Sequence, residues 1–88
     1  MKVKAYWHID KVNDSFAKRI RDILNEDTEV LVFAYEIDDE DIVTDVCFEE
    51  ARTGGGVSLV EVTGEQRRLV EDEVWGEVVG VINKGEKE

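Results

Sequence analysis

The sequence contains no proline and only one cysteine and one histidine. Because Cys47 is alone, no disulfide can form within the chain, and a hydrophobic core must hold the fold. His8 has neither a serine nor a cysteine at a spacing typical of a nucleophilic enzyme, which argues against that class of catalysis. Glycine clusters only at Gly54 to Gly56, so the chain shows neither a linker nor a repeat. We therefore predict a single domain over residues 1–88.

Long apolar runs are also missing from the chain. No stretch approaches the roughly 18 apolar residues of a membrane-spanning helix. The N-terminal stretch MKVKAYWHIDK lacks the apolar segment of about 7–15 residues that a secretory signal peptide requires. These two absences predict a soluble cytoplasmic protein that does not contact a membrane.

Cations are scarce in the second part of the chain. Residues 1–35 carry six cations and six carboxylates, whereas residues 36–88 carry five cations and sixteen carboxylates, so the net charge of −11 lies entirely in the second part. Residues 36–50 contain eight carboxylates and no cation. Nucleic-acid binding depends chiefly on Lys and Arg that neutralise phosphates, and this charge balance argues against it. The balance favours a basic protein partner or no partner.

Two hydrophobic periods follow one another at the start of the chain. Residues 3–12 alternate between apolar and polar side chains, which is the period of a half-buried strand. Residues 13–26 change to the spacing of an amphipathic helix. The N-cap of this helix is predicted to be Asn13, Asp14 or Ser15.

The middle of the chain predicts three further strands. Residues 29–37 are apolar on both faces, so we expect a central strand that is covered on both sides. Residues 38–41 form a predicted turn into a strand over 42–49, which gives a hairpin with an anionic tip. In that strand one predicted face carries Ile42, Val46 and Phe48, and the other carries Val43, Asp45, Cys47 and Glu49. The glycines of the RTGGG sequence, 52–56, then provide a turn into a strand over 57–62.

The last predicted element is a helix that runs from Thr63 to about residue 82. Thr63 and Gln66 form a T-x-x-Q capping box, and Trp75 falls on the apolar arc, where we expect it in the core. The valines and glycines of residues 76–82 are also compatible with a strand, and the pattern leaves this choice open. The predicted fold class is α+β, in the order β-α-β-β-β-α, with a mainly antiparallel sheet packed by two helices.

The acidic segment around the predicted hairpin is the candidate site, and three interpretations remain open: a metal site, a solvated turn, or a surface that binds a partner. An EF-hand calcium loop needs glycine at its sixth position, but counting from Asp38 that position is Val43. A hairpin tip also lacks the cleft that separates the pKa values of a catalytic carboxylate pair. The candidate partner-binding residues are Glu36, Asp38, Asp39, Glu40, Asp41, Asp45, Glu49 and Glu50.

No other motif predicts catalysis or a cofactor. The TGGG sequence lacks the Lys-Ser/Thr pair that completes a phosphate-binding loop, and it precedes a strand instead of a helix. The cations Lys18, Arg19 and Arg21 are interpreted as the solvated side of the first helix. We expect no catalytic residues, no metal ligands and no cofactor, and hence a protein that is not an enzyme.

A resemblance adds context to the second half of the chain. Residues 41–79, DIVTDVCFEEARTGGGVSLVEVTGEQRRLVEDEVWGEVV, run through a strand, a glycine turn, a second strand and a Thr-capped helix that contains Glu and Trp. In this order they resemble the C-terminal half of many small acidic bacteriophage-encoded proteins. The resemblance carries no catalytic motif. It implies a protein in the host cell cytoplasm that binds and blocks a host protein, in some cases by resembling DNA in its charge.

The leading hypothesis is a small acidic, non-enzymatic protein that engages a basic surface of a partner protein and inhibits it, as a phage-type inhibitor or a DNA mimic. A partner rich in Arg and Lys, such as a nucleic-acid-binding protein, would gain association rate from the negative field.

Two other hypotheses remain open. The alternative is a structural or assembly module whose charge only gives solubility, with a homodimer formed through Gly76 and Gly80 or through an apolar sheet face. The third is a divalent-metal-binding protein or an enzyme. The apolar sheet face is predicted from Val32, Ala34, Val43 and Cys47.

Overall fold

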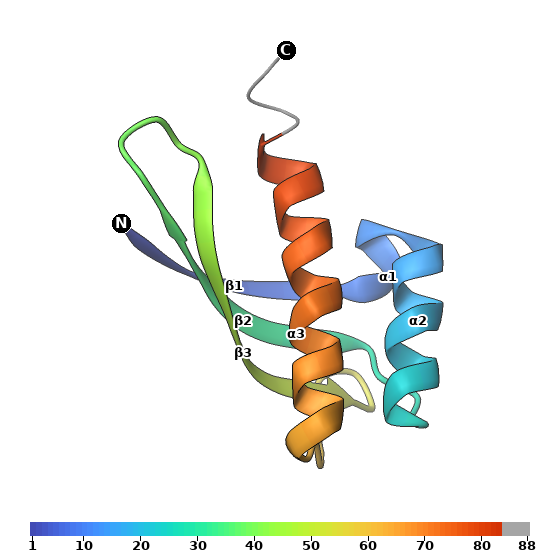
Figure 1. The fold of residues 1–88 in the computed structure, drawn as a ribbon. Coiled ribbons are helices and arrows are strands. Elements are labelled where there is room, and N and C mark those ends of the chain that lie inside the picture. Colours follow the sequence, from blue (N-terminus) through green and yellow to red (C-terminus); the bar gives the residue numbers. More distant parts are fainter. Residues whose placement is uncertain (84–88) are drawn as a thin grey trace.

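The computed structural model describes residues 1–83 of the chain (Figure 1). It contains a four-stranded antiparallel sheet with helices packed on it, which confirms the predicted α+β class. The elements are β1 (Lys2–His8), α1 (Ile9–Val12), α2 (Asp14–Leu24), β2 (Val30–Ile37), β3 (Val43–Thr53), β4 (Ser58–Val60), α3 (Gly64–Val78) and the π-helical turn η1 (Val79–Asn83).

The strands lie in the order β1-β2-β3-β4, and each is antiparallel to its neighbour. The strand β2 is central, as predicted, and its first five residues are buried. Figure 1 shows α2 and α3 side by side against the sheet, where Leu31 and Phe33 of β2 join their core. We call the other side of the sheet the open face; it carries Tyr6, Val32 and Cys47.

The core forms where two helical stripes meet the sheet. Phe33 is fully buried, and the Trp7 ring packs edge-on against it with ring centroids 4.7 Å apart. Each large apolar side chain buried in this way contributes roughly 1.5–3 kcal/mol to stability. The helical residues of the core are Phe16, Ala17, Ile20, Leu24, Val70, Val74 and Val78.

The first strand ends earlier than its alternation predicts. The strand β1 stops at His8, and residues Ile9–Val12 form the single turn α1. The turn allows Asn13 to adopt an extended conformation, in which its Oδ1 accepts hydrogen bonds from the N–H groups of Ser15 at 2.8 Å and Phe16 at 3.1 Å. Asn13 is therefore the N-cap of α2, one of the three predicted candidates.

The predicted faces of β3 are wrong at its start. Two register shifts interrupt the pairing of β2 with β3, and each leaves two β3 residues between consecutive core-facing ones. Val43 and Val46 face the core, as do Phe48 and Ala51. Ile42 lies outside the strand and is exposed. Strict alternation had reversed Ile42 and Val43 because a β-bulge shifts the side-chain period by one residue.

The apolar sheet face predicted from Val32, Ala34, Val43 and Cys47 does not form. Val43 packs in the core below the helices, whereas Val32 and Ala34 are only 5% and 2% exposed on the open face. The glycine turn packs close to β2: a Cβ on Gly56 would lie 3.5 Å from Val30 Cγ2. Glycine is required there, since Gly56 also has a φ of 85°.

Residues 76–82 are helical, which decides between the two open choices. The N–H of Thr63 donates to Gln66 Oε1 at 3.4 Å, and the two residues form the predicted capping box at the start of α3. The prediction for Trp75 is wrong, because its side chain is 41% exposed. The core stripe of α3 passes through Val70, Val74 and Val78, and Trp75 lies about 100° around the helix from Val74.

Candidate partner-binding surface

The β2–β3 hairpin ends in a turn that Asp38 holds together. Its Oδ1 accepts hydrogen bonds from the N–H groups of Glu40 at 2.9 Å and Ile42 at 3.0 Å. Asp41 adopts a left-handed conformation with a φ of 60°, which Asp tolerates better than most residues. Asp38 therefore shapes the turn, and the carboxylates of Asp39, Glu40 and Asp41 extend from it as exposed side chains. We call these three residues the acidic tip.

The two β-bulges determine which carboxylates of β3 avoid the core. The first bulge leaves Thr44 and Asp45 exposed, and Thr44 Oγ1 donates to the backbone oxygen of Glu36 at 3.4 Å. The second bulge places Glu49 and Glu50 next to each other outside the core. The evenly spaced row of charges that a regular strand would give is therefore absent from this part of the hairpin.

Some of the candidate carboxylates are paired with cations inside the protein. The N-terminal ammonium lies 3.7 Å from Glu36, Lys4 Nζ lies 3.1 Å from Glu49, and Arg52 Nε lies 2.5 Å from Glu50. These pairs are partly exposed, so each adds little to stability but lowers the local negative charge. Within residues 1–83 no ion pair forms at Asp38, Asp39, Glu40, Asp41 or Asp45.

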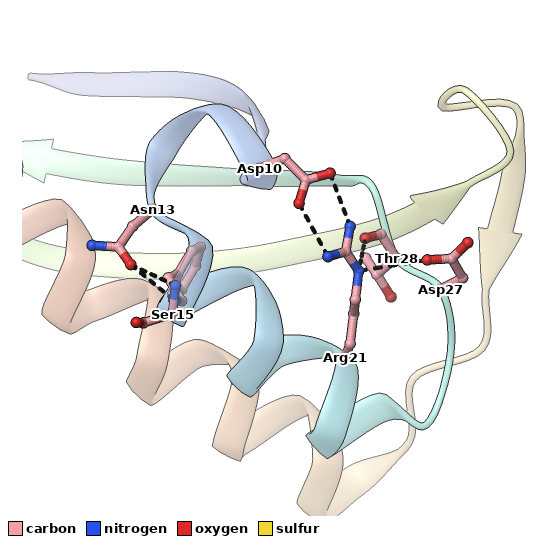
Figure 2. A network of polar contacts seen from close by, with 7 residues as sticks. Asp10, Asn13, Ser15, Arg21, Asp27 and Thr28 are labelled. Carbon is pink, nitrogen blue, oxygen red and sulfur yellow. Dashed lines mark hydrogen bonds and ion pairs between the residues drawn. The ribbon is translucent and has the colours of Figure 1, made fainter.

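We call the helices α1, α2 and α3, the loop between α2 and β2, and the sheet residues packed on the helices the helical end of the molecule. Arg21 connects several of these elements (Figure 2). Its guanidinium donates two hydrogen bonds to the carboxylate of Asp10, both at 3.0 Å, and one to the backbone oxygen of Thr28 at 3.0 Å. Asp27 lies 3.6 Å from the same side chain. Arg21 thereby joins α1, α2 and the loop that leads into β2.

Charged side chains also join α3 to its two neighbours. Arg19 of α2 contacts Glu73 at 2.6 Å and Glu77 at 3.4 Å. On the other side, Glu71 accepts a hydrogen bond at 2.9 Å from the backbone N–H of Phe48 in β3. The short strand β4 pairs only with residues 51–53 of β3, so Glu71 supplies an acceptor that β4 does not.

The interpretation of the cationic trio as a solvated helix face holds for Lys18 and Arg19, which are both exposed, and is wrong for Arg21, which is partly buried. Lys18 pairs with Asp22 at 3.2 Å one turn along the helix, whereas Arg19 also reaches across to α3. Arg19 and Glu73 are 54 positions apart in the sequence. The helical period gives no signal for such a contact, because it describes only neighbours within one helix.

These contacts shift the pKa values of the groups involved. The hydrogen bond from Arg21 holds the pKa of the Asp10 carboxyl below its usual 3.8, against a smaller opposing effect of desolvation. The same hydrogen bond raises the pKa of Arg21, and the hydrogen bond to Glu73 raises the pKa of Arg19. Both arginines are thus held as cations by carboxylates of the helical end.

The described part of the chain offers no metal cluster and no pocket. Within residues 1–83, no group of three or more His, Cys, Asp or Glu side chains is placed to hold a metal ion. No pocket opens among these residues. None of the described helices is long and apolar enough to cross a membrane. Cys47 is exposed and is a free thiol.

Comparisons with family models, with curated proteins and with solved structures give no match to this chain.

Proposed function

We propose that this chain is a small acidic binding protein, without enzymatic activity, that engages a basic surface of a partner protein through the acidic tip and inhibits that partner. One observation carries the proposal: the tip carboxylates have no cation beside them in the described structure, whereas the carboxylates of the strands and helices are largely paired. A basic surface would supply the missing cations. The partner class is a protein rich in Arg and Lys, including nucleic-acid-binding proteins.

The geometry of the hairpin supports recognition in a defined shape. Two hydrogen bonds to Asp38 constrain the backbone of the turn. The carboxylates of the acidic tip are therefore presented by a turn of defined conformation. A preorganised surface loses less conformational entropy on binding. The negative field of such a tip also raises the association rate with a positive partner.

Ion pairs at three of the strand carboxylates reduce the number of residues that we assign to the binding surface. Glu36, Glu49 and Glu50 already have cations nearby, so they add less to the field than their number suggests. We therefore place recognition on Asp39, Glu40, Asp41 and the neighbouring Asp45. Blocking of a DNA-binding surface, as in a phage-type inhibitor of the host cytoplasm, is the form of inhibition that the charge favours.

A matched pair of variants tests the proposal. The tip variant combines Asp39→Asn, Glu40→Gln and Asp41→Asn, and leaves the turn-forming Asp38 intact. Wild type and tip variant are immobilised, exposed to the same bacterial extract, and the captured proteins are compared by quantitative mass spectrometry. We expect a basic protein that wild type captures and the tip variant loses.

The control variant removes the same number of charges elsewhere. It carries substitutions at exposed carboxylates that form no ion pair in the described structure: Glu26→Gln, Glu61→Gln and Asp72→Asn. We expect this variant to capture the same protein as wild type. Equal capture by all three forms, or equal loss in both variants, would contradict recognition by the acidic tip.

A further inference from the structure

The free edge of the sheet along β1 is the most regular unpaired feature of the described structure. Met1 and Ile37 exchange two backbone hydrogen bonds, at 2.7 and 2.9 Å, and this fixes the alternation of the antiparallel pair. The backbone N–H and C=O groups of Lys2, Lys4 and Tyr6 must then point away from β2. Within residues 1–83 these groups meet no backbone or side-chain partner.

Of the common protections of an edge strand, β1 has the charged side chains Lys2 and Lys4 but neither a proline nor a bulge. Proteins usually shield edges with proline, a bulge, a very short strand or charged side chains. The strand β1 is seven residues long and pairs with β2 without a register shift. Lys4 extends inward over the open face to reach Glu49 at 3.1 Å. The hydroxyl of Tyr6 also lies inward, 3.2 Å from where a Cβ on Gly56 would be.

We propose that β1 pairs with β1 of a second copy of this chain, antiparallel and about a two-fold axis at Ala5. In this register Lys4 of one copy exchanges backbone hydrogen bonds with Tyr6 of the other, and Lys2 lies opposite His8. An axis at Lys4 would place two lysines directly opposite each other, which is unfavourable. An axis at Tyr6 would leave Lys2 beyond the end of the other strand.

Repulsion between two negatively charged copies does not oppose this arrangement strongly, because the acidic tips lie far from the contact. The acidic tip follows Ile37, which pairs with Met1 at the start of β1. Antiparallel pairing therefore places the two tips at opposite ends of the joint sheet. The strand spans about 23 Å at roughly 3.3 Å per residue, and salt screens exposed charges beyond about 8 Å. The edge itself carries Lys2 and Lys4 and no carboxylate.

The side chains along the proposed contact also complement each other. On the helix side of the sheet, Val3 of one copy lies opposite Trp7 of the other, and both are half-buried in the single chain. Tyr6, which is 52% exposed, lies opposite Lys4 of the other copy on the open face, so no two like charges face each other there. This inference does not depend on the proposed function, because it concerns a different surface.

The oligomeric state and the register can be tested together. Sedimentation equilibrium of the wild type is expected to give the mass of a dimer. In a Cys47→Ser background, Ala5→Cys should form an intermolecular disulfide on mild oxidation, since directly opposed residues of a non-hydrogen-bonded pair have Cα atoms about 4.5 Å apart. The matched control Val3→Cys should not, because two Val3 positions are roughly 13 Å apart in this register.

A third variant tests the edge without touching the pairing with β2. Lys4→Pro removes an N–H that points outward, and proline is tolerated at such edge positions. Its circular dichroism should match the wild type, while the sedimenting mass falls by half. A monomeric wild type, a dimer that survives Lys4→Pro with the fold intact, or equal cross-linking of the two cysteine variants would each overturn the proposal.

Discussion

At the helical end of the molecule arginines and carboxylates meet in pairs, whereas the tip of the β2–β3 hairpin carries carboxylates without cations. Arg19 and Arg21 bind Glu73 and Asp10 and thereby connect elements that are distant in the sequence. The carboxylates of Asp39, Glu40 and Asp41 form no ion pair within residues 1–83. Like charges set side by side destabilise a folded state, and at the tip no cation offsets this cost. The comparison shows that charges connect elements of the fold in one region and have no such contacts in the other.

The two regions should differ most in how much stability is lost when an apolar side chain is truncated. Phe33→Ala removes a fully buried ring at the helical end and is expected to lower the free energy of unfolding by about 3–5 kcal/mol. That is a large share of the 4–13 kcal/mol expected for about 0.05–0.15 kcal/mol per residue. Ile42→Ala at the tip should cost less than about 0.5–1 kcal/mol. Urea unfolding measures both; a similar loss for the two variants would contradict the comparison.

A smaller effect is expected where α3 meets the edge of β3. Glu71→Ala removes the acceptor of the Phe48 N–H, and we expect a loss of about 1–2 kcal/mol because that donor is then unpaired in a half-buried place. Asp72→Ala is the matched control. Asp72 is next to Glu71 in α3, is exposed, and makes no such hydrogen bond. Its effect should stay within about 0.5 kcal/mol. Equal losses in urea unfolding would show that Glu71 acts only through the charge of the helix.

Thr28 offers a gain in stability at the helical end. Its side chain is fully buried, and Oγ1 has no hydrogen-bond partner among the described residues. Replacing an unpaired buried hydroxyl by a methyl group of similar size removes a desolvation cost, so Thr28→Val is expected to raise the free energy of unfolding by up to about 1 kcal/mol. Thermal unfolding measures this change. A clear decrease in melting temperature would mean that the hydroxyl contributes a contact absent from the structure.

The smallest effect concerns the pH dependence of the Asp10–Arg21 pair. The pKa of Asp10 is lower in the folded state than its usual 3.8. Ionisation of Asp10 therefore stabilises the folded state relative to the unfolded state. This contribution is present above pH 3.8 and is lost as pH falls through the folded pKa. Asp10→Asn should therefore be less stable than the wild type at pH 7, with the difference shrinking below pH 3.8. Urea unfolding from pH 7 to pH 2.5 measures it; a constant difference would contradict the assignment.

The sequence predicted those parts of the fold that depend on local period. The amphipathic stripe of α2, a cap among Asn13, Asp14 and Ser15, and the two-sided burial of β2 are all visible in the spacing of apolar and capping residues. The position of the hairpin tip was predictable for the same reason, since residues 38–41 interrupt two apolar strands. The order of elements follows from these signals.

Features that depend on distant contacts were not predictable. Each β-bulge, at Thr44 and at Glu49, adds one residue to β3 and so changes which side chains of the strand face the core. Nothing in the local alternation of apolar and polar residues marks these positions. The pairing of Lys4 with Glu49 arises only after β2 has brought β1 and β3 into one sheet. Composition counts paired and unpaired carboxylates alike, so it could not separate Glu36, Glu49 and Glu50 from the carboxylates without a cation.

The most direct test of recognition by the acidic tip is the salt dependence of the association rate. The basic protein retained by wild type in the capture experiment is purified, and its association with wild type, tip variant and control variant is followed by surface plasmon resonance between 0.01 and 0.3 M salt. We expect the tip variant to associate about tenfold more slowly at low salt, with the gap closing as the screening length shortens, and the control variant to match the wild type within about twofold. Identical rates and salt slopes for the tip variant and the control variant would contradict the account.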